Sequence, residues 1–186
     1  SLCAVKNGIS IDTSMGFTPQ EGILMGTRSG SIDPTIIPYI MKRRNLTPDQ
    51  MSDVLNKKSG LLGVTGISND ARNCEEAAEK GDYKAKLALE MLTDGIKRYI
   101  GSYIAELNGL DVLVFTAGIG ENSVSTRESV CKDMSYLGIE IDEDKNRNFK
   151  RGVPFDITGP NSKVKVLIIP TNEEYMIALD CQALIK

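Results

Sequence analysis

The chain has 186 residues, of which 41% are hydrophobic and 25% are charged, and its formal net charge is −3. This composition is ordinary for one domain or one lobe of a globular protein, and it excludes collagen, coiled coils and disordered chains. The histidine count is zero, which excludes a Ser-His-Asp triad and histidine-based zinc catalysis within the chain. We expect no nucleic-acid partner, because no block of positive charge stands out.

The four cysteines are scattered without a CxxC pair, and no apolar run reaches the roughly 20 residues that a membrane span needs. Zinc clusters, dithiol redox sites and a disulfide framework are therefore not expected. No charged segment followed by an apolar run opens the chain, so we expect no signal peptide, no membrane partner and a cytoplasmic location. The chain starts without Met, and a fragment of a longer protein is the natural explanation.

In chain order, the sequence first predicts a β-hairpin over residues 1–13. Asn7-Gly8 is the strongest two-residue hairpin signal, and apolar residues alternate on either side of it. Residues 14–30 are rich in glycine and too irregular for a long helix. We expect an ordered loop there, and such loops in compact domains are often functional.

Two capping signals predict the helices that follow. Asp33-Pro34 places proline at the first position of a helix that extends to about residue 44. Thr47 and Gln50 have the spacing of a capping box, which predicts a second helix that ends near residue 60.

The strongest helix is predicted for residues 82–107. Its apolar residues recur at spacings of three to five, namely Leu87, Met91, Ile96, Ile100, Tyr103 and Leu107. Asn108-Gly109 is expected to end it. Most of this apolar stripe is expected to pack inside the domain.

The near-continuous apolar run at 111–116 predicts a strand that is buried on both faces. AGIGENS follows as a turn, and Ser125 and Glu128 form a capping box for a helix from 125 to about 134. Further downstream, the sequence predicts short strands at 139–141 and 153–158, a strand at 163–170 and a last helix at 171–185. Strands that alternate with helices predict an α/β domain with a largely buried sheet.

The best candidate site is the segment that joins the 111–116 strand to the next helix. Gly118 and Gly120 would let a ligand lie against the backbone, and open α/β sheets bind ligands at the carboxyl ends of strands. A tight turn that needs glycine only for its geometry is an equally good explanation. The pattern matches neither GxGxxG nor a P-loop.

Two further candidates are charged. Arg28 lies between glycines, and its planar guanidinium suits phosphoryl or carboxylate oxygens, although a surface arginine is the commoner case. Glu173 follows the 163–170 strand and could reach a metal ion or a water. Glu174 is expected to be structural, because Thr171 and Glu174 have the spacing of a capping box.

Six segments, in the same order, resemble the signatures of the acetate kinase family. They are residues 10–22 (SIDTSMGFTPQEG), 25–34 (MGTRSGSIDP), 56–64 (NKKSGLLGV), 68–72 (SNDAR), 115–123 (FTAGIGENS) and 169–174 (IPTNEE). The resemblance implies an α/β, ribonuclease H-like domain of the acetate and sugar kinase/heat-shock-70/actin class, with a mixed sheet flanked by helices. It also implies reversible phosphoryl transfer from ATP to acetate, with acetyl phosphate and ADP as products and Mg²⁺ as cofactor.

The resemblance further assigns roles to individual residues. Arg28 stabilises the phosphoryl group in transfer, and Pro19, with Phe17 nearby, lines the pocket for the acetate methyl group. Glu173 matches a magnesium-associated glutamate. The nucleotide contacts fall on Asp70, Ala71, Arg72, Gly118, Ile119, Gly120, Glu121 and Asn122. Ala71 stands where larger side chains are often found, so its contact is expected to involve only backbone.

By the same resemblance, residues 1–186 are a single domain, the C-terminal nucleotide-binding lobe of an acetate kinase whose N-terminal lobe is absent. The phosphate-binding turn and further catalytic residues of the family lie outside this chain, so we expect the chain alone to be inactive. A homodimer through this lobe is also expected, with the 82–107 helix as one element of the contact.

Two alternatives stay open. The first is a sister kinase that acts on propionate or butyrate, although Phe17 slightly favours acetate. The second is a nucleotide-binding or assembly module without catalysis.

Overall fold

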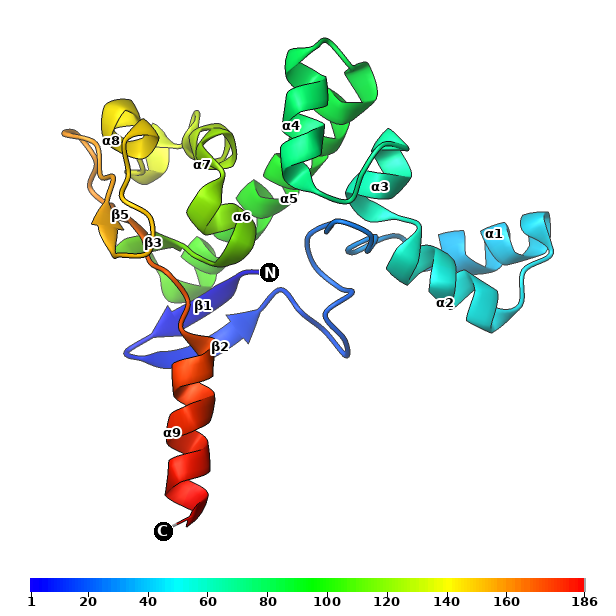
Figure 1. Ribbon diagram of the computed structural model, residues 1–186, viewed down its shortest axis with the longest axis horizontal. Coiled ribbons are helices and arrows are strands. Elements are labelled where there is room, and N and C mark those ends of the chain that lie inside the picture. The colour runs from blue at the N-terminus through cyan, green and yellow to red at the C-terminus, as the bar shows by residue number, and fades with distance from the viewer. Residues whose placement is uncertain (186) are drawn as a thin grey trace. The chain divides into compact units, whose positions relative to one another are not determined.

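The computed structural model describes residues 1–185, which fall into two compact units, Ser1–Gly109 and the part from Leu110 onward (Figure 1). The first unit contains β1 (Cys3–Lys6), β2 (Ile9–Thr13), α1 (Ile36–Arg44), α2 (Pro48–Lys57), α3 (Gly60–Thr65), α4 (Ala71–Glu79) and α5 (Tyr83–Leu107). The second contains β3 (Val112–Phe115), α6 (Ala117–Asn122), α7 (Val124–Cys131), the 3₁₀ helix η1 (Ser135–Leu137), α8 (Glu143–Arg147), β4 (Phe155–Asp156), β5 (Lys165–Ile168) and α9 (Glu173–Ile185).

The predicted hairpin at the start of the first unit is confirmed. β1 and β2 pair antiparallel, and the turn residues Asn7 and Gly8 have φ of 53° and 78°. Positive φ at both central positions is what a type I′ turn requires, and an Asn-Gly pair adopts it at low cost. The segment that follows, residues 14–30, has no helix or strand, as predicted.

The helix starts are only partly as predicted. Thr47 and Gln50 form the capping box that opens α2. α1 begins at Ile36 instead of Pro34, because the Asp33 carboxylate accepts from the backbone N–H of Thr35 at 2.9 Å and holds a turn there. The sequence did not predict α3 and α4, which are short.

The long helix α5 is confirmed. The Asp82 side chain caps its start by accepting from the Ala85 N–H at 2.8 Å, and Asn108 ends it with a φ of 59°. The predicted stripe is wrong at Met91, whose side chain is 46% exposed. α5 packs against α3 and α4. Its buried residues include the small Ala85 and Ala88, and the others are Leu92, Ile100 and Tyr103.

The second unit is built on a mixed sheet with strand order β3-β5-β4, in which β3 and β5 are parallel and β4 is antiparallel to β5. This confirms an α/β arrangement with a mixed sheet. β5 is central, and its Val166 and Ile168 are buried. The prediction that β3 is buried on both faces is wrong, since β3 is an edge strand and Val112 and Val114 are 41% and 43% exposed. The ribonuclease H-like class stays a prediction.

The helices of this unit begin earlier or later than the patterns indicated. AGIGENS is helical from Ala117 as α6, and the next helix is capped by Ser123, whose hydroxyl accepts from the Thr126 N–H at 3.0 Å. The predicted cap at Ser125 is therefore wrong. The predicted Thr171–Glu174 capping box is wrong by one residue. α9 begins at Glu173, and the Asn172 side chain accepts from the Tyr175 N–H at 3.3 Å.

α9 has no buried residue and stands clear of the sheet (Figure 1). It is too short to cross a bilayer, and no other helix within residues 1–185 is long and apolar enough to do so.

Candidate functional site

The loop that carries Arg28 is hydrogen-bonded to the end of α2 and to the start of α3. The Thr27 hydroxyl donates to the Asn56 carbonyl at 2.8 Å, and the Ser29 N–H donates to the Leu55 carbonyl at 3.0 Å. These bonds satisfy carbonyls in the last turn of α2, which have no partner within the helix. The same backbone therefore caps α2 and holds Arg28 in place.

The other side of this loop caps α3. The Leu61 N–H donates to the Met25 carbonyl and the Leu62 N–H donates to the Gly26 carbonyl, both at 2.9 Å. Gly60 is required at this junction, because its φ is 60° and a Cβ there would collide with the Met25 carbonyl. The segment from Met25 to Ser29 is thus an ordered loop, as the sequence predicted.

The Arg28 side chain is half-buried, and its contact within the protein is weak. Its Nη1 lies 3.8 Å from Sδ of Met25. Within residues 1–185, Arg28 takes part in no ion pair. A guanidinium on a fixed backbone without a carboxylate partner is suited to bind an external anion.

Asp70 has a structural role in addition to the predicted nucleotide contact. Its carboxylate caps α4 by accepting from the Arg72 N–H at 2.9 Å, and it also accepts from Nη2 of Arg72 at 2.6 Å. These hydrogen bonds lower the pKa of the Asp70 carboxyl. Ala71 is buried at the start of α4. Arg72 is exposed, and its guanidinium is oriented by Asp70.

The structure brings the Arg28 loop and the segment that precedes α4 side by side. A Cβ on Gly26 would lie 2.5 Å from the Asn69 carbonyl, so only glycine allows this approach. Two motifs that are about 40 residues apart in the sequence therefore meet in the first unit.

Pro19 and Phe17 lie in the same unit on the loop that leads to Arg28. Both side chains are exposed, and Phe17 is fully so. The loop is tied to the Arg28 segment, because the Ser31 N–H donates to the Gly22 carbonyl at 2.8 Å. An aromatic ring without cover on an ordered loop is consistent with a surface that a ligand or another chain segment completes.

The predicted nucleotide segment at α6 contains a strained residue. Ala117 has a φ of 57°, which is unfavourable for a residue with a Cβ. Gly118 follows with nothing within 4 Å of the position that its Cβ would occupy, so neither backbone nor packing requires a glycine there. Ile119, Gly120, Glu121 and Asn122 continue this helix, and the nucleotide contact of the segment stays a prediction.

α6 and α9 each begin just after the carboxyl end of a strand of the sheet. β3 and β5 are parallel neighbours with Phe115 opposite Ile168, and the Ile169 N–H donates to the Phe115 carbonyl at 2.9 Å. α6 follows β3, and α9, with Glu173 as its first residue, follows β5. The role of Glu173 at a metal ion stays a prediction.

Comparison with known proteins now decides the family. The chain matches the acetokinase family over residues 1–179. It is 54% identical to an acetate kinase of Treponema denticola over 186 residues, which is 100% of this chain and 46% of that protein. The crystal structure of Porphyromonas gingivalis acetate kinase superposes with a TM-score of 0.92 at 47% identity, covering 99% of this chain and 46% of that one. The chain belongs to the acetokinase family.

A propionate kinase from Francisella tularensis is also similar, with a TM-score of 0.87 and 45% identity over 95% of this chain and 44% of that one. The chain thus spans about half the length of the acetokinase-family proteins that it matches. Its position within their length, and the single-domain interpretation, stay predictions.

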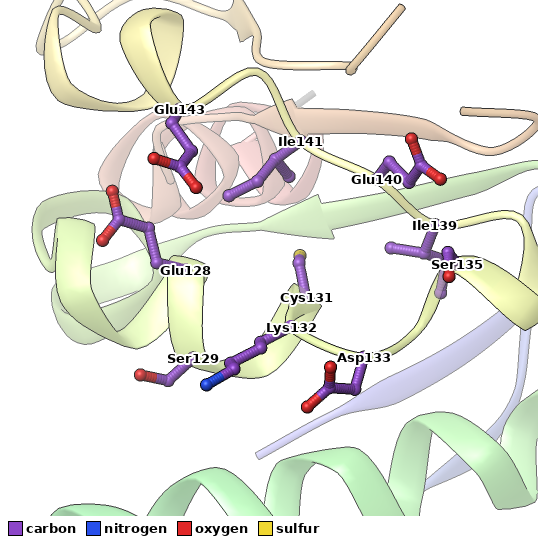
Figure 2. Close-up of a pocket in the computed structure, with 10 residues that line it drawn as sticks. All are labelled: Glu128, Ser129, Cys131, Lys132, Asp133, Ser135, Ile139, Glu140, Ile141 and Glu143. Atoms are coloured by element: carbon purple, nitrogen blue, oxygen red, sulfur yellow. The ribbon is translucent and has the colours of Figure 1, made fainter. Parts of the chain in front are cut away.

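A cleft of about 570 Å³ in the second unit is distinct from the predicted acetokinase site (Figure 2). Its charged lining residues are Glu128, Lys132, Asp133, Glu140 and Glu143, and none of the predicted site residues lines it. Carboxylates outnumber the ammonium group, so the cleft does not suit nucleotide phosphates.

Sequence reasoning missed one residue that contacts the α6 segment, Arg127. It is fully buried, and its Nη1 donates to the carbonyls of Gly120 and Glu121 in the predicted nucleotide segment. The available signal was an arginine inside an otherwise apolar helix face directly after a glycine-rich motif.

Proposed function

We propose that the whole protein to which these residues belong transfers the γ-phosphoryl group of ATP to acetate. The observation that carries the proposal is the Arg28 guanidinium, which is held on a fixed loop beside the 69–72 segment and has no ion pair within residues 1–185. The membership in the acetokinase family supports the same reaction.

In this reaction a carboxylate oxygen of acetate forms a bond to the γ-phosphorus while the bond from that phosphorus to the β–γ bridging oxygen breaks. The products are acetyl phosphate and ADP. Such transfers depend on alignment and on neutralisation of charge, more than on covalent help from the protein. Arg28 would hold the oxygens of the transferring group, and Pro19 with Phe17 would contact the acetate methyl group.

The proposed nucleotide contacts are Asp70, Ala71 and Arg72 in the first unit and, in the second, the α6 segment from Gly118 to Asn122. Glu173 can supply one carboxylate oxygen to Mg²⁺, which commonly takes one or two carboxylates together with phosphate and water oxygens. Within residues 1–185 no cluster of three acidic or cysteine residues could hold a metal ion alone, which fits that mode of binding. The bound ion would supply neutralisation of phosphate charge.

Acetate is the proposed acyl substrate, and propionate is the second candidate because a propionate kinase is among the similar structures. One methylene group in an apolar pocket changes the free energy of binding by only about 1–3 kcal/mol. The similarity alone therefore does not separate the two. We further propose a ribonuclease H-like fold class and a homodimer for the whole protein.

The experiment is a phosphoryl-transfer assay on the whole protein with acetate, propionate and butyrate. We expect the highest kcat/KM with acetate, and we expect Arg28→Ala to reduce kcat by roughly 10³-fold or more with little change in nucleotide affinity. Arg98→Ala is the matched control, because Arg98 lies on the exposed face of α5 and pairs only with Asp94 four residues earlier. Near-normal turnover of the Arg28 variant would remove the proposed role.

The 186-residue chain by itself is expected to have no turnover. Calorimetric titration of this chain with ATP separates the remaining alternative, since a binding module without catalysis needs affinity for nucleotide without any other segment.

A further inference from the structure

Arg127 has the most completely buried charged side chain of the second unit, with an exposed fraction of 0%. Its Nη1 donates to the Gly120 carbonyl at 2.9 Å and to the Glu121 carbonyl at 2.8 Å. These two carbonyls lie in the last turn of α6, where the helix itself offers them no partner. The arginine therefore completes the C-terminal end of the strained glycine-rich helix.

The other side of the guanidinium is held by Asn146, which is also fully buried. Nε donates to Oδ1 of Asn146 at 2.6 Å, and Nη2 donates to the backbone carbonyl of the same residue at 3.4 Å. Nδ2 of Asn146 in turn donates to the Val124 carbonyl at 3.2 Å. The Phe149 ring covers the guanidinium at 4.4 Å. Arg127 thus connects α6 to α8 through one rigid fork.

Within residues 1–185 this buried cation takes part in no ion pair. Glu128 on the same helix acts on it electrostatically but forms its ion pair with Arg147. Burial lowers the pKa of Arg127 to about 10, so the guanidinium still carries its charge at neutral pH. Carbonyl dipoles and a ring compensate a buried charge less well than a carboxylate does, so this arrangement costs folding free energy. The donors of this buried cation go to α6 and α8, so the arrangement fixes these two segments relative to each other.

We infer that Arg127 is a positioning residue that fixes α6 in the conformation that binds the nucleotide. The inference rests on the proposed function of α6. Because Ala117 at the start of this helix has a φ of 57° and Gly118 has no Cβ to restrict its backbone, α6 needs an external constraint, and the two bonds from Arg127 act on its other end. Without them, α6 would relax, and nucleotide affinity would fall while the acyl site would be unaffected.

The test compares Arg127→Lys with Arg147→Lys in the whole protein. Lysine keeps the charge but can replace at most part of the fork, whereas Arg147 is an exposed arginine next to Asn146 whose bonds go to Glu128 and Glu143. We expect Arg127→Lys to raise the KM for ATP by about tenfold, as loss of charge-assisted hydrogen bonds implies, with the KM for acetate within about twofold. The control variant should leave both values unchanged. A residue needed only for folding would lower kcat through the active fraction and leave both KM values alone, which would overturn the inference.

A second measurement does not depend on activity. Amide hydrogen exchange without nucleotide should become about tenfold faster in residues 117–123 of the Arg127→Lys variant, while β5 stays protected. If the lysine variant does not fold, Asn146→Ala removes the side-chain acceptor of Arg127 Nε and should give the same pattern with a smaller increase in exchange rate. Unchanged exchange in residues 117–123 of a folded variant would contradict the inference. If the unmodified protein neither binds ATP nor phosphorylates acetate, the proposed function fails, and the exchange result still decides whether Arg127 constrains α6.

Discussion

The second unit contains a buried charged residue, Arg127, and an exposed helix rich in apolar residues, α9. The Arg127 guanidinium donates hydrogen bonds to α6 and α8 and contacts the Phe149 ring. The apolar residues of α9 are exposed, with Ile177 62% exposed and Leu184 87% exposed. The more polar region is buried and the more apolar region is not.

This difference separates what the unit stabilises by itself from what it leaves open. A single helix of 13 residues is marginal in water, because most helical stability in proteins comes from packing an apolar face. α9 has no such packing within the described residues. Since the similar acetokinases are about twice as long, we expect the surface of α9 to be covered in the whole protein.

The largest effect is expected at the buried centre. Arg127→Met removes the fork and leaves buried carbonyls and Oδ1 of Asn146 without their donor, so it should lower the free energy of unfolding by about 3 kcal/mol. Urea unfolding followed through amide protection in β5 would measure this. Arg147→Met should change the same quantity by less than about 0.5 kcal/mol, as exposed ion pairs do. Equal effects of the two substitutions would erase the contrast between the two regions.

A double substitution sharpens the interpretation of that loss. Asn146→Leu added to Arg127→Met removes the orphaned partner as well as the donor, so the pair should be less destabilised than the sum of the single changes by about 1–2 kcal/mol. The same unfolding experiment on all four proteins gives the coupling. Strict additivity would mean that Arg127 and Asn146 act independently.

Tyr103 in the first unit shows a buried polar group without satisfaction. Within residues 1–185 its hydroxyl is buried without a hydrogen-bond partner, and burial raises the pKa of the phenol to about 12. Tyr103→Phe should therefore increase the free energy of unfolding at neutral pH by about 1 kcal/mol. Because the unfolded phenol ionises near its ordinary value of 10.0, stability should fall between about pH 10 and 12, and the Phe variant should lose less over this range. A destabilised Phe variant would reveal a partner for the hydroxyl.

The smallest effect is expected on α9. Leu184→Gln in the 186-residue chain should change the midpoint of thermal unfolding by no more than the measurement error, because Leu184 is 87% exposed. In the whole protein the same change should be destabilising. A clear loss already in the 186-residue chain would mean that α9 is packed in solution.

The sequence predicted those features that depend on neighbouring residues. The Asn7-Gly8 hairpin, the Thr47 capping box and the long helix from Tyr83 were found because their signals are local. The strand at Val112 was misjudged because its apolar run does not reveal that β3 lies at the edge of the sheet. Helix α6 was read as a turn, since its glycines disfavour helix and its end is stabilised by a residue on the next helix.

The candidate site divides in the same way. Motif resemblance found Arg28, the 70–72 segment and α6, but the partners that hold them are distant in sequence. Gly60 is needed at the Arg28 loop because its φ is 60° and because the Met25 carbonyl approaches it, and Asn146 matters because Arg127 donates to it. No spacing rule contains such long-range contacts.

The α6 segment from Gly118 to Asn122 is proposed to bind nucleotide in the whole protein. The most direct measurement is amide hydrogen exchange of the whole protein with and without ADP and Mg²⁺. We predict that added nucleotide slows exchange in residues 117–123 over the range of concentration in which it binds. Unchanged exchange in this segment, or protection confined to the cleft lined by Glu128 and Glu143, would contradict the proposal.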